Sequence, residues 1–253
     1  MGLLVLFLAA FLAGAINSVA GGGTLLTFPS LLAFGVSPIA ANATSTVALV
    51  PGSLSAGWAY RGDLRGSGKT LLTFALPSLV GGALGAFAVD RVGDATFARL
   101  VPWLIFGATA LFVVQAPVRA WLLSRIDRQR PSGRGATIGV ALFQLVVATY
   151  GGFFGAGMGI LMLAALAMLG LESIHRMNGV KNLAAVCING VASVTFIALG
   201  RVRWPLALLM AVGAVLGGAL GAGFAKKLGE RRVRALVVAI GVSIGLAMLV
   251  RGR

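Results

Sequence analysis

Residues 1–34 read MGLLVLFLAAFLAGAINSVAGGGTLLTFPSLLAF, a long apolar stretch with a run of glycines inside it. Between Leu3 and Phe34 it carries no charge, and it is too long for one ordinary helix across a hydrocarbon layer about 30 Å thick. Gly21, Gly22 and Gly23 interrupt it near the middle, and glycine adopts backbone turns that other residues resist. The stretch therefore predicts a membrane helix that breaks and starts again.

The composition supports a membrane protein throughout. Of 253 residues, 58% are hydrophobic and 11% are charged, whereas soluble domains carry about 25% charged residues. The net charge is +15, but the 6 acidic residues and nearly all the basic ones fall between or at the ends of apolar stretches. The excess is therefore expected to orient the chain and contact lipid headgroups, with no nucleic-acid partner. The chain has one cysteine, so an internal disulfide is excluded. With one cysteine and one histidine it has no plausible zinc site, and no cofactor is expected.

Other apolar stretches have the length of a membrane span. A second long stretch, at 136–171, is also interrupted by glycine. When each broken stretch is taken as one span, the chain is predicted to be an all-α polytopic membrane protein with about eight segments. The unbroken segments are predicted at 40–60, 70–89, 100–118, 182–199, 205–225 and 235–250.

The two halves of the chain resemble each other in order. Residues 20–26 fall on 155–161, and 81–86 fall on 217–222, at a nearly constant offset. We therefore predict two homologous four-segment repeats, 1–118 and 136–253, each with a glycine-broken first helix. The basic stretch 119–135 between them is expected to be a cytoplasmic linker.

The relative orientation of the repeats depends on the broken segments. If each broken segment crosses the membrane, the repeats are parallel; if each folds back as a hairpin, the repeats are inverted. Only the hairpin alternative places the basic cluster near the C-terminus on the same side as the linker, as the positive-inside rule favours. This cluster consists of Lys226, Lys227, Arg231, Arg232 and Arg234.

The breaks are candidate anion sites. A half-helix that restarts after glycine presents free N–H groups and the positive end of its dipole. Lys181 is the only Lys or Arg inside an otherwise uncharged helical run, beside the second break. The predicted substrate site comprises Asn17, Gly21, Gly22, Gly23, Thr24, Asn42, Thr44, Ser45, Gly155, Gly157, Gly159, Asn178, Lys181 and Asn182.

Each candidate also has a structural alternative. Lys181 lies near the start of its helix and could extend its amine to the interface. The Asn, Ser and Thr side chains could hydrogen-bond between helices, and the glycines could serve close helix packing. Packing is the favoured interpretation for the pairs Gly81/Gly85 and Gly217/Gly221, which lie in uninterrupted spans. No acidic residue lies inside a span, so the usual carboxylate proton relay is missing.

The motifs resemble those of a known family. They are the glycine-interrupted stretch 14–29, the Gly-Val-Ser-Pro at 35–38 followed by Ala-Asn-Ala-Thr-Ser at 41–45, Tyr-Arg-Gly at 60–62, and the second-half echo at 151–182. Together they resemble the sulfite exporter TauE/SafE family of prokaryotic membrane permeases. The resemblance implies a duplicated permease of the bacterial inner membrane that moves sulfur-containing anions such as sulfite or organosulfonates. Met158, expected to crowd the second turn, and Ala164, opposite Pro29, depart from the family pattern.

The sequence therefore predicts a secondary transporter for a small anion, working by alternating access around the two breaks. The alternative is a non-transporting scaffold or accessory subunit of another membrane complex. An enzyme is disfavoured because the spans contain no convincing set of catalytic groups. The exact substrate, the transport direction, the coupling ion and the oligomeric state are left open.

Overall fold

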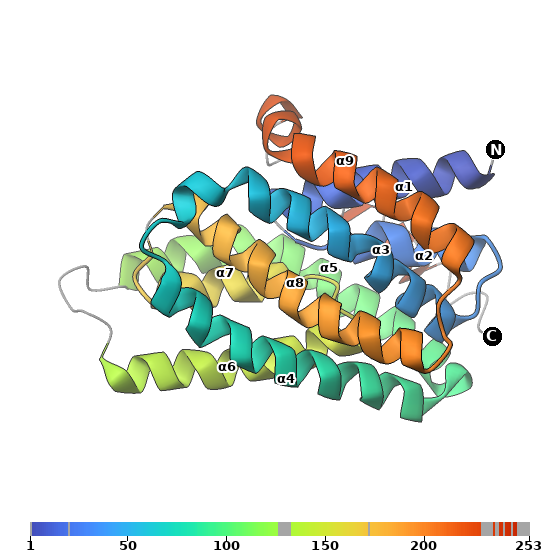
Figure 1. Cartoon of the computed structure of the whole chain (residues 1–253), viewed down its shortest axis with the longest axis horizontal. Coiled ribbons are helices and arrows are strands. Elements are labelled where there is room, and N and C mark those ends of the chain that lie inside the picture. The colour runs from blue at the N-terminus through green and yellow to red at the C-terminus, as the bar shows by residue number, and fades with distance from the viewer. Residues whose placement is uncertain are drawn as a thin grey trace.

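A computed structural model describes residues 2–19, 21–125, 133–171 and 173–228, together with residues 235, 238, 239, 241–243, 245 and 246. This described part is helical and contains no strand (Figure 1). Its elements are α1 (Gly2–Val19), α2 (Thr24–Ala33), α3 (Pro38–Ala59), the 3₁₀ turn η1 (Arg61–Leu64), α4 (Gly68–Val92), α5 (Asp94–Arg125), α6 (Arg134–Phe153), α7 (Met158–Met168), α8 (Ile174–Ala198) and α9 (Trp204–Leu228).

Six of the described helices are long and apolar enough to cross a membrane: α1, α4, α5, α6, α8 and α9. This confirms the prediction of an all-helical, multi-pass membrane protein. The total of eight spans stays a prediction, as does the exact division into repeats. Helix α3 has 22 residues but is less apolar. Outside the described residues lie residues 126–132 of the linker, residues 236, 237, 240, 244 and 247–250 of the predicted span 235–250, and Arg231, Arg232 and Arg234.

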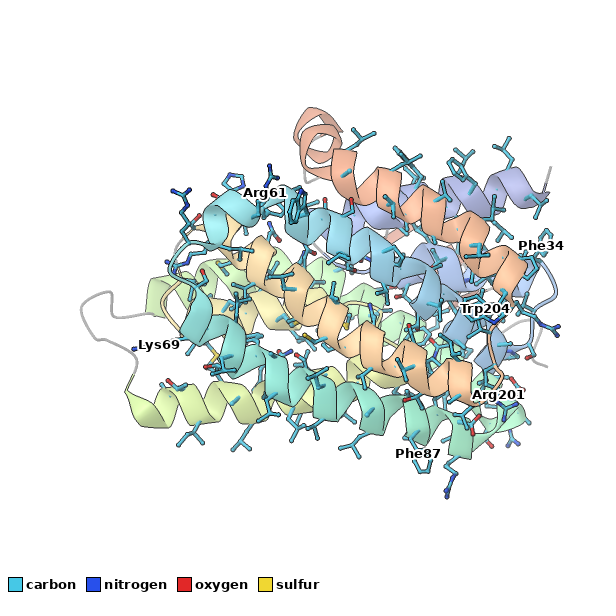
Figure 2. The ribbon with its side chains drawn as sticks, viewed as in Figure 1. Phe34, Arg61, Lys69, Phe87, Arg201 and Trp204 are labelled. Carbon is cyan, nitrogen blue, oxygen red and sulfur yellow. The ribbon has the colours of Figure 1, made fainter. Side chains whose placement is uncertain are left out.

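The surface of the bundle matches a lipid environment. Large apolar side chains such as Leu72, Val146 and Val194 are exposed along the helices. Charged side chains lie at the two ends, with Lys69 at one end and Arg201 at the other (Figure 2). Because apolar side chains face lipid at lower cost than water, this distribution is the one expected of helices that span a bilayer.

Both broken stretches contain a short returning helix. Helix α2 has 10 residues and α7 has 11, and each runs back toward the end of the bundle at which α1 or α6 begins (Figure 1). A Cβ on Gly2, at the start of α1, would lie 2.5 Å from the ring of Phe34, which follows α2. The chain therefore reaches the interior through α1 and turns back within the bundle.

The first helix of each half packs against a helix of the other half. Helix α1 of the first half lies along α9, and α6 of the second half lies along α4. Glycine allows both contacts: a Cβ on Gly217 would lie 1.9 Å from the carbonyl oxygen of Phe11, and one on Gly85 would lie 2.0 Å from that of Thr149. The predicted packing role of Gly81/Gly85 and Gly217/Gly221 is confirmed, because each of these glycines faces backbone of the opposite helix.

Replacing Gly85 by alanine is expected to destabilise the fold by about 2 kcal/mol, since the new methyl group forces α4 and α6 apart. The measurement is thermal unfolding of the purified protein in detergent. Gly107→Ala on α5 is the control, because nothing lies within 4 Å of its Cβ position. Equal unfolding temperatures for the two variants would contradict the close contact of α4 with α6.

Candidate functional site

The glycine breaks of the two halves meet inside the bundle. A Cβ on Gly21 would lie 2.8 Å from the Cα of Gly159. The turns depend on left-handed backbone, with φ of +82° at Gly21, +110° at Gly22, +79° at Gly155 and +80° at Gly157. Because residues other than glycine rarely adopt these angles, the local sequence fixes where each helix breaks.

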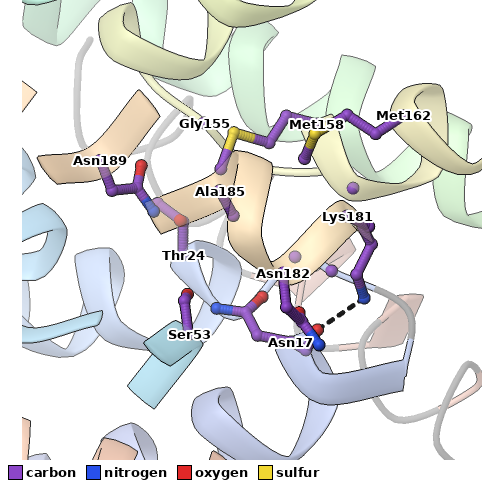
Figure 3. Close-up of a pocket in the computed structure, with 13 residues that line it drawn as sticks. Asn17, Thr24, Ser53, Gly155, Met158, Met162, Lys181, Asn182, Ala185 and Asn189 are labelled. Atoms are coloured by element: carbon purple, nitrogen blue, oxygen red, sulfur yellow. Dashed lines mark hydrogen bonds between the residues drawn. The ribbon is translucent and has the colours of Figure 1, made fainter. Parts of the chain in front are cut away.

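A small cavity lies beside this meeting point (Figure 3). It has about 20 Å³ of space for water-sized molecules, which is room for about one water. The lining residues come from both halves: Asn17, Gly21, Gly22, Thr24, Ser53, Gly155, Met158, Gly159, Met162, Lys181, Asn182, Ala185 and Asn189.

Lys181 is buried at this cavity. Its side chain is 1% exposed, and its Nζ donates a hydrogen bond to the backbone carbonyl of Asn17 at 2.7 Å. Helix α8 begins at Ile174, well before the predicted run at 182, so Lys181 lies inside the helix and its amine points into the bundle. The alternative in which Lys181 extends to the interface is therefore wrong. Among the described residues, no acidic side chain forms an ion pair with it.

The end of α1 is held by residues of α8. The last carbonyls of a helix have no partner within the helix, and here Asn182 Nδ2 donates to the carbonyl of Ser18 at 3.2 Å, beside the Lys181 bond. The Oδ1 of Asn17 accepts the N–H of Gly23 at 2.7 Å, which fixes the first break. The second half thus anchors the break of the first.

This end of the cavity is rich in hydrogen-bond donors. An ammonium group has three N–H donors, and Lys181 uses one of them within the described structure. The carboxamide of Asn17 is engaged through its oxygen, so its NH₂ group is available to a ligand. The half-helices α2 and α7 begin at the cavity with Thr24 and Met158, and helix N-termini favour negative charge. The arrangement suits a small anion.

The structure brings some of the predicted site residues to the cavity and places others nearby. Asn42 Nδ2 donates to the carbonyl of Phe153 at the end of α6, at 3.0 Å. Thr44 Oγ1 accepts the N–H of Arg203, and Ser45 hydrogen-bonds Thr27, so these two join neighbouring segments. Asn178 is buried, and its Oδ1 has no partner in the described part. The predicted residues outside the cavity lining are Gly23, Asn42, Thr44, Ser45, Gly157 and Asn178.

Several residues that line the cavity lie outside the predicted set, namely Ser53, Met158, Met162, Ala185 and Asn189. A helical period could have found part of this set, because Lys181, Ala185 and Asn189 recur every four residues on one face of α8. Met158 was expected to crowd its turn. Instead Gly157 makes the turn, and a Cβ on Gly151 would lie 2.7 Å from the Met158 sulfur, so Gly151 leaves room for that side chain.

The chain is similar to known membrane transporters. The model of the family described as sulfite exporter TauE/SafE matches residues 6–248. A probable membrane transporter protein of Haemophilus influenzae is 30% identical over 247 residues, covering 93% of this chain and 90% of that protein. The probable membrane transporter protein YfcA of Escherichia coli K12 is also 30% identical, covering 97% of this chain and 88% of its own.

A more distant relative is the probable membrane transporter protein YunE of Bacillus subtilis, which is 25% identical over the whole chain. The names of these relatives describe transport and no catalytic activity. No solved structure matches the chain. Since the family model covers nearly the full length, the chain belongs to the sulfite exporter TauE/SafE family of membrane transporters.

Proposed function

We propose that this protein is a secondary transporter for a small anion, a sulfur-containing oxyanion such as sulfite or an organosulfonate, which binds where the two glycine breaks meet. The observation that carries the proposal is the buried amine of Lys181, which faces a cavity and has no acidic partner among the described residues. The substrate oxygens would contact this group, the Asn17 amide and the first N–H groups of the half-helices.

The energetics of a buried charge support an anionic substrate. Removing an ammonium group from water costs several kcal/mol, and one carbonyl dipole offsets only part of that cost. A second compensating charge is therefore favoured, and an anion in the cavity supplies it. We expect the substrate to contain sulfur because the description of the family names sulfite.

The proposed mechanism is alternating access between inverted repeats in the bacterial inner membrane. The returning helices α2 and α7 and the exchanged packing of α1 and α6 support this proposal. Since both halves supply residues to the cavity wall, movement of one half against the other would open the cavity toward each side in turn.

The inverted arrangement predicts which loops share a side of the membrane. In a Cys187→Ala background, Ser173→Cys and Ala136→Cys should be labelled from the same side, because a hairpin of α6 and α7 returns the chain to where it entered. Ser37→Cys should be labelled from the opposite side. The measurement is labelling of intact cells with an impermeant maleimide, and all three side chains are exposed. Labelling of Ser173→Cys together with Ser37→Cys would instead establish the crossing arrangement.

Transport itself is tested in proteoliposomes. Radiolabelled sulfite or methanesulfonate should enter vesicles that contain the protein faster than empty vesicles, and choline should not. The scaffold alternative predicts no flux of any anion and a cavity closed to water. Ser53→Cys, in the same Cys187→Ala background, distinguishes the two: a transporter exposes this position to a water-soluble maleimide, and excess substrate protects it.

A further inference from the structure

Three neutral polar side chains converge on the cavity away from Lys181. They are Thr24 at the start of α2, Ser53 in the middle of α3 and Asn189 in the second half of α8. Figure 3 shows Thr24, Ser53 and Asn189 grouped on one side and Lys181 on the other, with Asn17 and Asn182 between them. The cavity therefore has a charged end and a neutral polar end.

The two ends differ in how the protein uses their polar groups. At the charged end, Asn17, Lys181 and Asn182 each make a hydrogen bond to protein. At the neutral end, the side chains of Thr24, Ser53 and Asn189 make no hydrogen bond within the described part of the chain, although Ser53 is only 2% and Asn189 only 7% exposed. Their polar atoms are accessible from the cavity and are free to hydrogen-bond a ligand group there.

The register of the repeats places two of these residues at equivalent positions. Asn42 and Asn178 each occupy the fifth residue of their helices, α3 and α8, and Ser53 and Asn189 follow them at the same spacing. Helices α3 and α8 pack against each other, so each half contributes one neutral polar side chain to the same end of the cavity. The grouping follows from the duplicated architecture.

The residue types indicate which chemical group would bind there. Hydroxyl and carboxamide groups both donate and accept hydrogen bonds, which matches a hydroxyl group of a ligand. No charged side chain lines this end, so a second ionised group would be left uncompensated. Met158, Met162 and Ala185 form an apolar side of the cavity wall, and methionine side chains adapt easily to a short carbon chain.

We propose that Thr24, Ser53 and Asn189 form a second subsite that binds the hydroxyl group of a short hydroxy-substituted organic anion, whose charged group lies at Lys181. This inference rests on the proposed anion transport and adds which anions the transporter selects. The protein then prefers such an anion over one of equal size that lacks the hydroxyl, and over one that carries a second charge.

The test is competition in proteoliposomes with three probes: 2-hydroxyethanesulfonate, ethanesulfonate and sulfoacetate. Wild type should take up the hydroxylated anion at least about tenfold more efficiently than the other two, because a site that binds a hydroxyl group discriminates strongly against analogues without it. In the double variant Ser53→Ala/Asn189→Leu, the ratio of 2-hydroxyethanesulfonate uptake to ethanesulfonate uptake should fall to about 1.

A matched control isolates the subsite from general effects on α8. Ser53→Ala alone should reduce the preference several-fold, whereas Ser193→Ala should leave it unchanged, because Ser193 is also buried but does not line the cavity. If wild type transports 2-hydroxyethanesulfonate and ethanesulfonate equally well, the second subsite is refuted and anion transport stands. If no anion is transported at all, both proposals are refuted.

Discussion

Lys181→Met is expected to reduce the initial rate of anion uptake into proteoliposomes by about 100-fold. Methionine has nearly the length of lysine but no charge, so the variant removes the ammonium group that faces the cavity while it keeps the packing. Loss of one partner from a buried, hydrogen-bonded charge pair costs several kcal/mol of binding, which corresponds to at least this factor. The measurement is uptake of whichever sulfur oxyanion the wild type transports.

Two controls separate function from folding. Lys69→Met removes a charge at the start of α4, where the side chain is exposed, and should leave transport unchanged. The unfolding temperature of Lys181→Met should stay close to that of the wild type, because removal of the desolvation cost of a buried charge offsets the lost hydrogen bond to the Asn17 carbonyl. Wild-type flux in Lys181→Met would exclude Lys181 from substrate binding.

Local signals in the sequence predicted the breaks and the buried lysine. Glycine runs mark where a helix cannot continue, and a single lysine in a charge-free stretch is conspicuous at membrane depth. The packing role of the pairs Gly81/Gly85 and Gly217/Gly221 was also predictable, since small residues four apart are typical of close helix contacts. In each case the physical reason lies within a few neighbouring residues.

The rest of the site depends on contacts between distant parts of the chain. Ser53 and Asn189 lie far from both breaks in sequence, and only the packing of α3 against α8 brings them to the cavity. Conversely, Asn42, Thr44 and Ser45 are close in sequence to the first break but hydrogen-bond protein groups outside the cavity lining. A polar residue inside a membrane helix does not reveal from sequence whether its partner is protein or substrate.

Gly21→Ala is expected to lower both transport and stability far more than Gly35→Ala, although the two glycines have nearly the same backbone geometry. Their φ angles are +82° and +84°, so alanine costs about 1–2 kcal/mol of backbone strain at either position. Gly35 has nothing within 4 Å of its Cβ position, whereas Gly21 faces the Cα of Gly159 at 2.8 Å. The difference between the two variants therefore measures the contact between the breaks.

At Gly21 the added methyl group must separate two backbones, which adds about 1–3 kcal/mol to the strain. Gly21→Ala should therefore unfold at a clearly lower temperature in detergent than Gly35→Ala and show little anion uptake. A bulky neighbouring side chain could rotate away from a new methyl group, but the Gly159 Cα has no such freedom. Equal behaviour of the two variants would mean that the breaks of the two halves are not in contact, and the cavity between them would lose its structural basis.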